Sequence, residues 1–258
     1  MSAAFVTSPM LAATPGVAHG FFTRRGGVSS GGFASLNCSL SGKDDPDAVR
    51  INRARAMDAI GLPPPALSSV HQVHGIAVAV VEAPIPDAAR PPADAMVTRR
   101  PGLALGIITA DCAPVLFADA GAGVVGAAHA GWRGAVAGVL EATIEAMCAI
   151  GARRARIAAA IGPCIHQASY EVGPDLRDAV LARDPADARF FAAGAREDRW
   201  QFDLPGYCAA RLAAGGIGTE ALPEDTLASE EKFFSHRRNT LAKGGPIGHQ
   251  LSAIALTG

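Results

Sequence analysis

The sequence predicts a protein of the α+β or layered α/β class. Short apolar runs bounded by turn residues are interspersed with segments in which apolar residues recur at helical spacing. Some of these runs follow one another without an intervening helix, which favours adjacent strands over a strict alternation of strand and helix. Hydrophobic residues make up 49% and charged residues 18% of the 258 residues. A sizeable core can therefore form, and because no composition break divides the chain we expect a single domain over residues 1–258.

Caps, prolines and apolar periodicity mark the helices. The tripeptide Asp44-Asp45-Pro46 predicts the start of a helix that runs to Ile60 and stops at Gly61. A second helix is predicted over residues 133–150, where it ends before Gly151. Two further helices are predicted near residues 175–183 and 205–214.

Apolar runs mark the strands. Residues 70–81 are rich in β-formers and lead into a proline-broken loop at 84–92. Shorter apolar runs bounded by turn residues predict buried strands at residues 103–108, 114–117, 124–128, 157–161 and 251–256.

Charge and cysteine usage exclude several classes of function. The formal net charge is −1, and the basic pairs are short and separated, so we expect no nucleic-acid or anionic-membrane partner. The five cysteines are odd in number and have no short repeating spacing, which indicates free thiols in a reducing compartment rather than a disulfide framework. The first 20 residues lack the features of a signal peptide, and no apolar run is long enough to span a bilayer. We therefore expect a soluble cytoplasmic protein, either a monomer or a small homo-oligomer.

A glycine pattern at residues 121–126 matches the dinucleotide-binding fingerprint in its letters only. Gly121, Gly123 and Gly126 have the required spacing, but that fingerprint has to lie between a strand and a helix. Here the glycines join two predicted strands. We therefore interpret residues 119–123 as a hairpin turn.

One cysteine and two histidines carry the strongest chemical signal. Cys112 follows Asp111 at the end of one apolar strand, and His129 ends another. The hairpin turn between these strands would bring the two side chains together. A further imidazole is available from His71 or His74, in the sequence His71-Gln72-Val73-His74-Gly75. Two imidazoles and one thiolate suit a zinc ion that keeps its fourth position open for water or substrate.

Other readings of these residues stay open. Cys112 could act as a metal-free nucleophile with His71 or His129 as its base. Two histidines and one cysteine also describe a copper centre, although seven histidines with no His-x-His pair are few for a multicopper cluster. The usual zinc-deaminase signature is absent. Asp111 could serve as a general base or could orient a metal ligand.

The chain resembles the laccase-domain family, also known as YfiH-type or multicopper polyphenol oxidase-like proteins and as purine nucleoside phosphorylases. The resemblance is nearly full length and rests on several motifs that occur in the family's order. They are Phe22-Thr23-Arg24-Arg25-Gly26-Gly27-Val28-Ser29, Ser35-Leu36-Asn37, Asn52-Arg53, His71-Gln72-Val73-His74-Gly75, Ala93-Asp94-Ala95-Met96-Val97-Thr98, Ala110-Asp111-Cys112-Ala113-Pro114-Val115, His129-Ala130-Gly131-Trp132-Arg133-Gly134 and Ile161-Gly162-Pro163-Cys164-Ile165.

This resemblance implies a single-domain, four-layered α/β/β/α fold related to bacterial deamidating toxins. It implies a zinc ion, with copper as the alternative, held by His71, Cys112 and His129. From its position beside Cys112, Asp111 is our further catalytic candidate. The implied reaction is phosphorolysis of purine nucleosides to free base and ribose 1-phosphate, with adenosine deamination as a second activity. A copper-binding polyphenol oxidase is the alternative enzyme, and a regulatory or binding protein with a vestigial site is a third hypothesis. We expect Asn37, Arg53 and Arg133 to contact the nucleoside and phosphate, since arginine forks bind phosphate well.

The chain departs from the family pattern in two places. After Asn37, where many relatives have Leu-Gly-x-His-x-Gly-Asp-Asp, this chain has Cys38-Ser39-Leu40-Ser41-Gly42-Lys43-Asp44-Asp45 and lacks the histidine. Near the end of the chain, the usual Ser-Tyr-Arg-Arg becomes Ser235-His236-Arg237-Arg238. An imidazole therefore replaces a tyrosine that could stack on a base, which leaves the base preference open.

Overall fold

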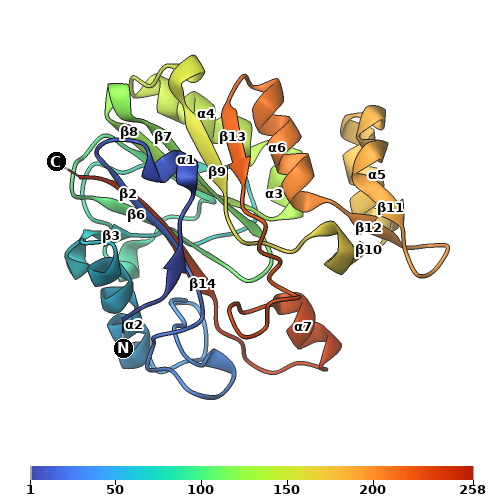
Figure 1. Ribbon diagram of the computed structural model, residues 1–258, viewed down its shortest axis with the longest axis horizontal. Helices are drawn as coiled ribbons and strands as arrows, with labels where there is room; N and C mark the ends of the chain where they lie inside the picture. Colours follow the sequence, from blue (N-terminus) through green and yellow to red (C-terminus); the bar gives the residue numbers. More distant parts are fainter. Residues whose placement is uncertain (1, 258) are drawn as a thin grey trace.

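Two large β-sheets lie face to face at the centre of the protein (Figure 1). The structure, a computed structural model, describes residues 2–257. One sheet has five strands in the order β1-β2-β14-β6-β3, and the other has six in the order β13-β9-β7-β8-β5-β4. The five-stranded sheet consists of β1 (Phe5–Val6), β2 (Val17–Phe22), β3 (Leu67–Ser68), β6 (Ala104–Thr109) and β14 (Gln250–Leu256). The six-stranded sheet consists of β4 (Val78–Val80), β5 (Ala95–Thr98), β7 (Ala113–Asp119), β8 (Val124–Ala130), β9 (Ala158–Ile161) and β13 (Gly218–Ala221).

Helices cover the outer face of each sheet. Helix α2 (Pro46–Ala59) packs against the five-stranded sheet, where its Ala56 and Met57 join a buried cluster with Ala104 and Leu251. The six-stranded sheet is covered by α3 (Trp132–Ala137), α4 (Val139–Ala149) and α6 (Leu204–Ala214). The order of layers is helix, sheet, sheet, helix. The predicted four-layered α/β/β/α architecture is confirmed.

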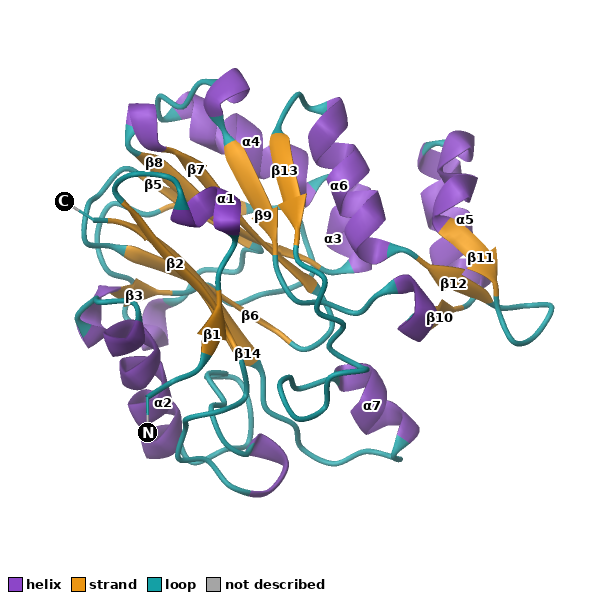
Figure 2. Cartoon of the chain, viewed as in Figure 1, coloured by secondary structure: helices purple, strands orange, loops and turns teal. Residues whose placement is uncertain are grey.

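A smaller unit projects from one side of these layers (Figure 2). It contains α5 (Pro174–Arg183) and a three-stranded sheet of β10 (Glu171–Val172), β12 (Trp200–Phe202) and β11 (Phe191–Ala193). The two remaining helices are short: α1 (Pro9–Ala12) precedes β2, and α7 (His236–Leu241) lies in the long segment between β13 and β14.

Strand β7 shows why the central strands read as continuous apolar runs. Val115 and Phe117 face the helices, whereas Leu116 and Ala118 face the other sheet. Side chains of a strand alternate between its two faces, so a strand that is buried on both faces needs apolar residues at every position.

Two predicted elements differ from the structure. The helix predicted over 133–150 is two helices, because Gly138 has a left-handed backbone (φ +109°) that ends α3 and starts α4. The strand predicted over 70–81 is confined to β4, and the chain from His71 to Ala77 forms a loop that contacts Pro91 and Asp94. The other predicted helices and strands are confirmed within two residues at their ends.

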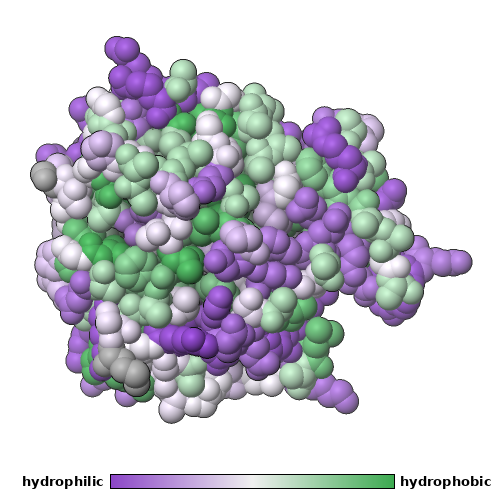
Figure 3. Space-filling model, viewed as in Figure 1, coloured by the Kyte–Doolittle hydropathy of each residue, from purple (hydrophilic) through white to green (hydrophobic). Residues whose placement is uncertain are grey.

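The glycine pattern at 121–126 lies in a hairpin, as predicted. A single turn of 3₁₀ helix over Ala120–Ala122 joins β7 to β8, and Gly123 has a left-handed backbone. Asp119 closes this turn by accepting a hydrogen bond from the Ala122 N–H at 3.1 Å. No helix within residues 2–257 is both long enough and apolar enough to cross a membrane. On the face drawn in Figure 3, hydrophilic and hydrophobic residues are interspersed.

Candidate metal centre

The β7–β8 hairpin brings Cys112 and His129 together. In its register Pro114 pairs with His129 and Ala113 pairs with Ala130. Cys112, which immediately precedes β7, therefore lies beside the carboxyl end of β8. The predicted closeness of the two strand ends is confirmed.

His74 is the third member of the group. The candidate ligand atoms of His74, Cys112 and His129 all lie within 4.8 Å of one another. The rings of His74 and His129 meet edge to face, with their centroids 4.8 Å apart. Gly131 permits this approach, because a Cβ atom at that position would lie 3.0 Å from the His74 ring and 3.1 Å from the Cys112 sulfur.

His71, the expected third ligand, is not in this group. Its backbone is extended and pairs with the neighbouring chain, since its N–H donates to the Pro91 carbonyl and its carbonyl accepts from the Ala93 N–H. The side chain is exposed and lines the same pocket. The structure therefore brings His74, rather than His71, together with Cys112 and His129.

Asp94 holds the histidine loop and His129 in place. One of its carboxylate oxygens accepts hydrogen bonds from the backbone N–H groups of Val73 and Gly75, at 3.1 and 2.7 Å. The other accepts from the His74 N–H at 2.9 Å and contacts His129 Nδ1 at 2.8 Å. These bonds support the left-handed backbone of His74 (φ +60°) and leave His129 Nε2 free to bind a metal.

Burial and hydrogen bonding compete at Asp94. Burial alone would raise the pKa of this carboxyl group, but the bonds from His129 and the backbone of Gly75 outweigh it and lower the pKa. The aspartate is therefore ionised and can fix the orientation of the His129 imidazole. Sequence reasoning did not single out this residue, although an aspartate directly before the apolar run Ala95-Met96-Val97 is an unusual place for a charge.

Cys112 and His129 stabilise each other's charged forms. Burial opposes ionisation of the Cys112 thiol, but the His129 charge and hydrogen bonds from His129 and His74 lower its pKa. Burial likewise opposes protonation of His129, but the Cys112 and Asp94 charges raise the pKa of the imidazole. The side chain of Cys112 is thus favoured as a thiolate, which is the form that binds metals.

The group lines a pocket of about 520 Å³, a size typical of small-molecule sites. Five of the seven histidines line it, namely His71, His74, His129, His236 and His249. The pocket wall also contains Ser39 and Ser41, from the segment that departs from the family pattern. His236, the second departure, is exposed at the same pocket.

Of the three residues expected to contact substrate, only Arg133 lines the pocket. Its guanidinium lies over the Trp132 ring, 4.3 Å from the ring centroid. Asn37 and Arg53 are instead buried behind the wall and make internal hydrogen bonds. The Asn37 side chain accepts from the N–H groups of Ser39 and His249, at 3.1 and 2.9 Å.

Arg53 has a similar internal role. Its guanidinium donates to the Cys38 carbonyl at 3.3 Å and to the Ser69 hydroxyl at 3.0 Å. Asn37 and Arg53 thus hold segments that flank the pocket. Neither lines the pocket.

The pocket also contains residues that sequence reasoning did not single out as site residues, among them Arg90, Tyr170, Arg237 and His249. Burial lowers the pKa of His249 to about 4, and the charges of His236 and His129 add to this effect. His249 is therefore neutral near pH 7. These residues come from segments far apart in the chain, so no local motif connects them.

The fold and this site define a mixed α/β domain with a His-Cys-His centre in a small-molecule pocket. Residues 18–257 match the family described as multi-copper polyphenol oxidoreductase laccase. The chain belongs to this laccase-like family.

Curated relatives of this chain are named purine nucleoside phosphorylases, a name that differs from the description of the family. A protein of Deinococcus radiodurans named purine nucleoside phosphorylase is 41% identical over 246 residues, which cover 93% of this chain and 89% of the relative. A protein of Streptomyces griseus, also named a purine nucleoside phosphorylase, is 46% identical over 230 residues, which cover 87% of this chain and 90% of the relative.

Solved structures share the whole fold. A protein of Neisseria meningitidis aligns over the full length of both chains with a TM-score of 0.86 and 35% identity. YlmD from Geobacillus stearothermophilus aligns over 99% of this chain and 100% of its own, with a TM-score of 0.88 and 28% identity.

Proposed function

We propose that this protein is a zinc-dependent purine nucleoside phosphorylase that converts adenosine, inosine or guanosine and phosphate into free base and ribose 1-phosphate. Deamination of adenosine is proposed as a second activity. The observation that carries the proposal is a His-Cys-His group lining a cation-rich pocket, in a chain 41% and 46% identical to proteins named for this activity.

The donor set fits zinc. We propose that His74, Cys112 and His129 hold the ion, because two imidazoles and a thiolate are three ligands that zinc accepts in catalytic sites. The bond from His129 Nδ1 to Asp94 is the supporting contact that such histidines usually make. When bound, zinc would supply a Lewis acid at an open coordination position.

The chain's own residues supply binding and orientation for phosphorolysis. In this reaction a phosphate oxygen bonds to the ribose C1′ while the bond from C1′ to the purine nitrogen breaks, and the electron pair leaves with the base, which gains a proton. Arg133 is placed to bind the phosphate, because it lines the pocket and its guanidinium has no carboxylate partner within residues 2–257. The neutral His249 can donate a hydrogen bond to the purine or accept one from it.

The polyphenol oxidase alternative draws on the description of the family. A multicopper oxidase needs several groups of ligands, including a trinuclear cluster. Across residues 2–257 the only group of three or more candidate ligand side chains is His74, Cys112 and His129. This donor count favours a mononuclear site and hence the phosphorylase.

The first prediction tests the proposed reaction. Zinc-loaded protein supplied with inosine and phosphate should release hypoxanthine and ribose 1-phosphate, and with adenosine it should release adenine together with inosine. Cys112→Ala should lower this activity by more than about 100-fold, because loss of the contacts that merely support a metal ligand already costs 10- to 100-fold. Chromatography of the products measures both activities.

Cys148→Ala is the matched control. Cys148 is a half-buried free cysteine on α4 and does not line the pocket. The activity of the Cys148→Ala variant should therefore equal that of the wild type. Absence of free base with wild-type protein, or undiminished product with Cys112→Ala, would contradict the proposal. Alkylation by iodoacetamide distinguishes a metal-free nucleophile, because a zinc ligand should be protected in the loaded protein and alkylated after zinc is removed.

A further inference from the structure

The pocket has more positive charge than its own acidic residues can balance. Arg90, Arg133 and Arg237 line it, and none has a carboxylate within 4.0 Å in the part of the chain that the structure describes. Asp111 is the only acidic residue among the lining side chains. A concave site with unpaired guanidinium groups attracts an anion.

Asp111 is already engaged with the protein. One carboxylate oxygen accepts a hydrogen bond from the Thr226 hydroxyl at 2.7 Å, and the other accepts from the backbone N–H of Arg237 at 2.5 Å. Asp111 is only 8% exposed and has a left-handed backbone (φ +87°), which its neighbours hold through the bond from the Ile165 N–H to its carbonyl. Its carboxylate therefore joins the end of β6 to the segment that carries Arg237.

The side chain of Arg237 is held at one edge and free at the other. Its Nη1 donates to the Glu171 carbonyl at 2.7 Å, and its guanidinium lies over the Tyr170 ring, 5.4 Å from the ring centroid. Its Nε and Nη2 have no hydrogen-bond partner within residues 2–257. A fixed guanidinium with spare donors is suited to bidentate binding of an oxyanion.

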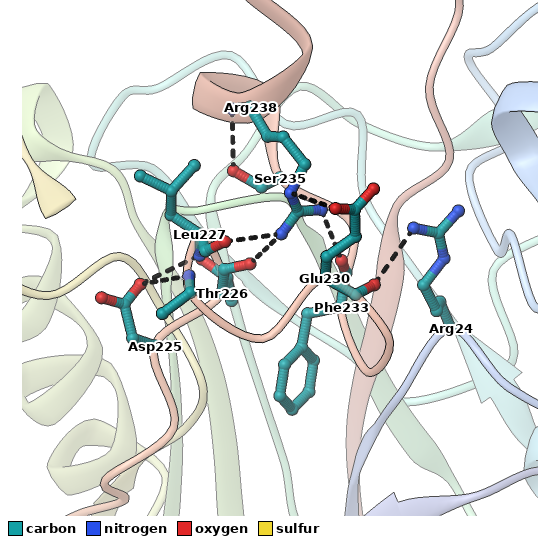
Figure 4. Close-up of polar contacts among 9 residues, drawn as sticks. Arg24, Asp225, Thr226, Leu227, Glu230, Phe233, Ser235 and Arg238 are labelled. Carbon is teal, nitrogen blue, oxygen red and sulfur yellow. Dashed lines mark hydrogen bonds and ion pairs between the residues drawn. The ribbon is translucent and has the colours of Figure 1, made fainter. Parts of the chain in front are cut away.

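The neighbouring Arg238 has the opposite role and closes the segment on itself (Figure 4). Its Nη2 donates to the carbonyls of Thr226 and Leu227, at 2.6 and 2.9 Å, and its Nη1 donates to the Phe233 carbonyl at 3.1 Å. The backbone N–H of Arg238 donates to the Ser235 hydroxyl at the start of α7. These bonds stiffen residues 226–238, so that Asp111 fixes Arg237 through an ordered segment.

Arg133 lines the same pocket as Arg237 and Tyr170. Cys112 of the candidate metal centre lines it as well. The two arginines therefore face one cavity together with the candidate metal centre. Their charges oppose the rise in the pKa of the Tyr170 hydroxyl that burial, Cys112 and Asp111 cause.

We propose that Arg237 is the principal binding group for the phosphate co-substrate, that Arg133 is the second cation of this subsite, and that Asp111 is a positioning residue that holds Arg237 there. This inference rests on the proposed phosphorolysis and assigns its anion subsite. It also replaces the catalytic role expected for Asp111, because both of that residue's carboxylate oxygens are occupied by the segment that it holds.

Steady-state kinetics with inosine in excess and phosphate varied test the proposal. Arg237→Ala should raise the KM for phosphate by about 10- to 100-fold, since a hydrogen bond to a charged group is worth this much, and should leave the KM for inosine within about 2-fold. Arg237→Lys should give a smaller rise, because it keeps the charge but loses the fork. Asp111→Asn should raise the KM for phosphate by about 3- to 10-fold through Arg237.

Arg50→Ala is the matched control, because Arg50 is exposed on α2 outside the pocket and should show wild-type constants. An unchanged KM for phosphate in Arg237→Ala, or an equal rise in both KM values, would overturn the inference. A thermal melt shows whether Asp111→Asn is folded. If that variant is unstable, the test of the phosphate subsite rests on the Arg237→Lys result alone.

Equilibrium dialysis with labelled inorganic phosphate separates this inference from the proposed function. If the wild type binds phosphate and Arg237→Ala does not, the anion subsite stands even if no nucleoside is cleaved, and only the proposed function fails. If nucleosides are cleaved and Arg237→Ala binds phosphate as well as the wild type, only the subsite fails. No binding and no cleavage would overturn both.

Discussion

Asp94 and Asp111 are two buried aspartates that support one pocket from different sides of its wall: Asp111 lines the pocket, whereas Asp94 does not. Asp94 is fully buried and accepts three backbone N–H groups from one short loop as well as contacting His129. Asp111 accepts bonds from residues that lie 115 and 126 positions further along the chain. The first aspartate organises neighbouring strands, and the second joins a distant segment to them.

This difference divides the pocket into two parts with separate supports. The His-Cys-His group is built between residues 74 and 129 on the end of one sheet. The arginine part depends on the segment between β13 and β14, which Arg238 and Asp111 hold. Variants of the two parts should therefore separate the affinity for metal from the affinity for phosphate.

The largest expected effect compares His74 with His71. His74→Ala should lower zinc affinity by more than about 100-fold and abolish turnover, because it removes one of three ligands. His71→Ala should leave zinc affinity within a few-fold of the wild type, since that imidazole is outside the group. Zinc competition with a chromophoric chelator measures both. If His71→Ala lost the metal and His74→Ala kept it, the assignment of the centre would be wrong.

The next largest effect is expected from loss of the support that Asp94 gives to the His129 imidazole. Asp94→Asn should lower zinc affinity by about 10- to 100-fold, because the amide keeps the shape of the carboxylate but holds the His129 imidazole less firmly. The KM for phosphate should change little in metal-saturated protein. The same chelator assay and phosphate kinetics measure the two quantities.

Asp119→Asn is the control for the general cost of neutralising a buried aspartate. Asp119 is 1% exposed and accepts bonds from the N–H groups of Ala122 and Arg153 and from the Arg156 guanidinium, away from the pocket. It should lower the free energy of unfolding without altering zinc affinity. Equal losses of zinc affinity in both variants would remove the special role of Asp94.

Features encoded by neighbouring residues could be predicted from the sequence. The turn at 119–123 joins two apolar runs, and this local pattern was enough to place Cys112 beside His129. The mixed α/β class follows from strands and helices interspersed along the chain, with some strands adjacent, whereas the four-layered order was implied by the family resemblance. The break at Gly138 could not be predicted, because apolar spacing continues on both sides of it.

The third ligand depended on long-range contacts. His71 and His74 are three residues apart, and nothing in their local sequence says which one joins Cys112 and His129. Asp94, some 20 residues further along, decides this by binding the N–H groups around His74. Likewise, Asn37 and Arg53 have the chemistry of ligand-binding residues. In the structure, however, they form hydrogen bonds with backbone and side-chain groups of the protein and so support its interior.

The smallest expected effect concerns a buried polar cluster that does not line the pocket. His19 Nε2 accepts the Ser8 N–H at 2.9 Å, and burial lowers the pKa of the imidazole from 6.5 although the Glu220 charge opposes this shift. The folded state therefore holds His19 neutral, whereas the unfolded chain takes up a proton below pH 6.5. Stability should fall as the pH drops through this range, by at most about 1.4 kcal/mol per pH unit from this one group.

His19→Gln makes that contribution measurable, because the amide oxygen can still accept the Ser8 N–H but does not titrate. Urea unfolding between pH 7.5 and 5 should show a smaller decline in the free energy of unfolding for this variant than for the wild type. The KM for phosphate should be the same in both proteins, because His19 does not line the pocket. Parallel declines would mean that His19 is not held neutral by the fold, whereas a changed KM would show that the pocket depends on a cluster outside its walls.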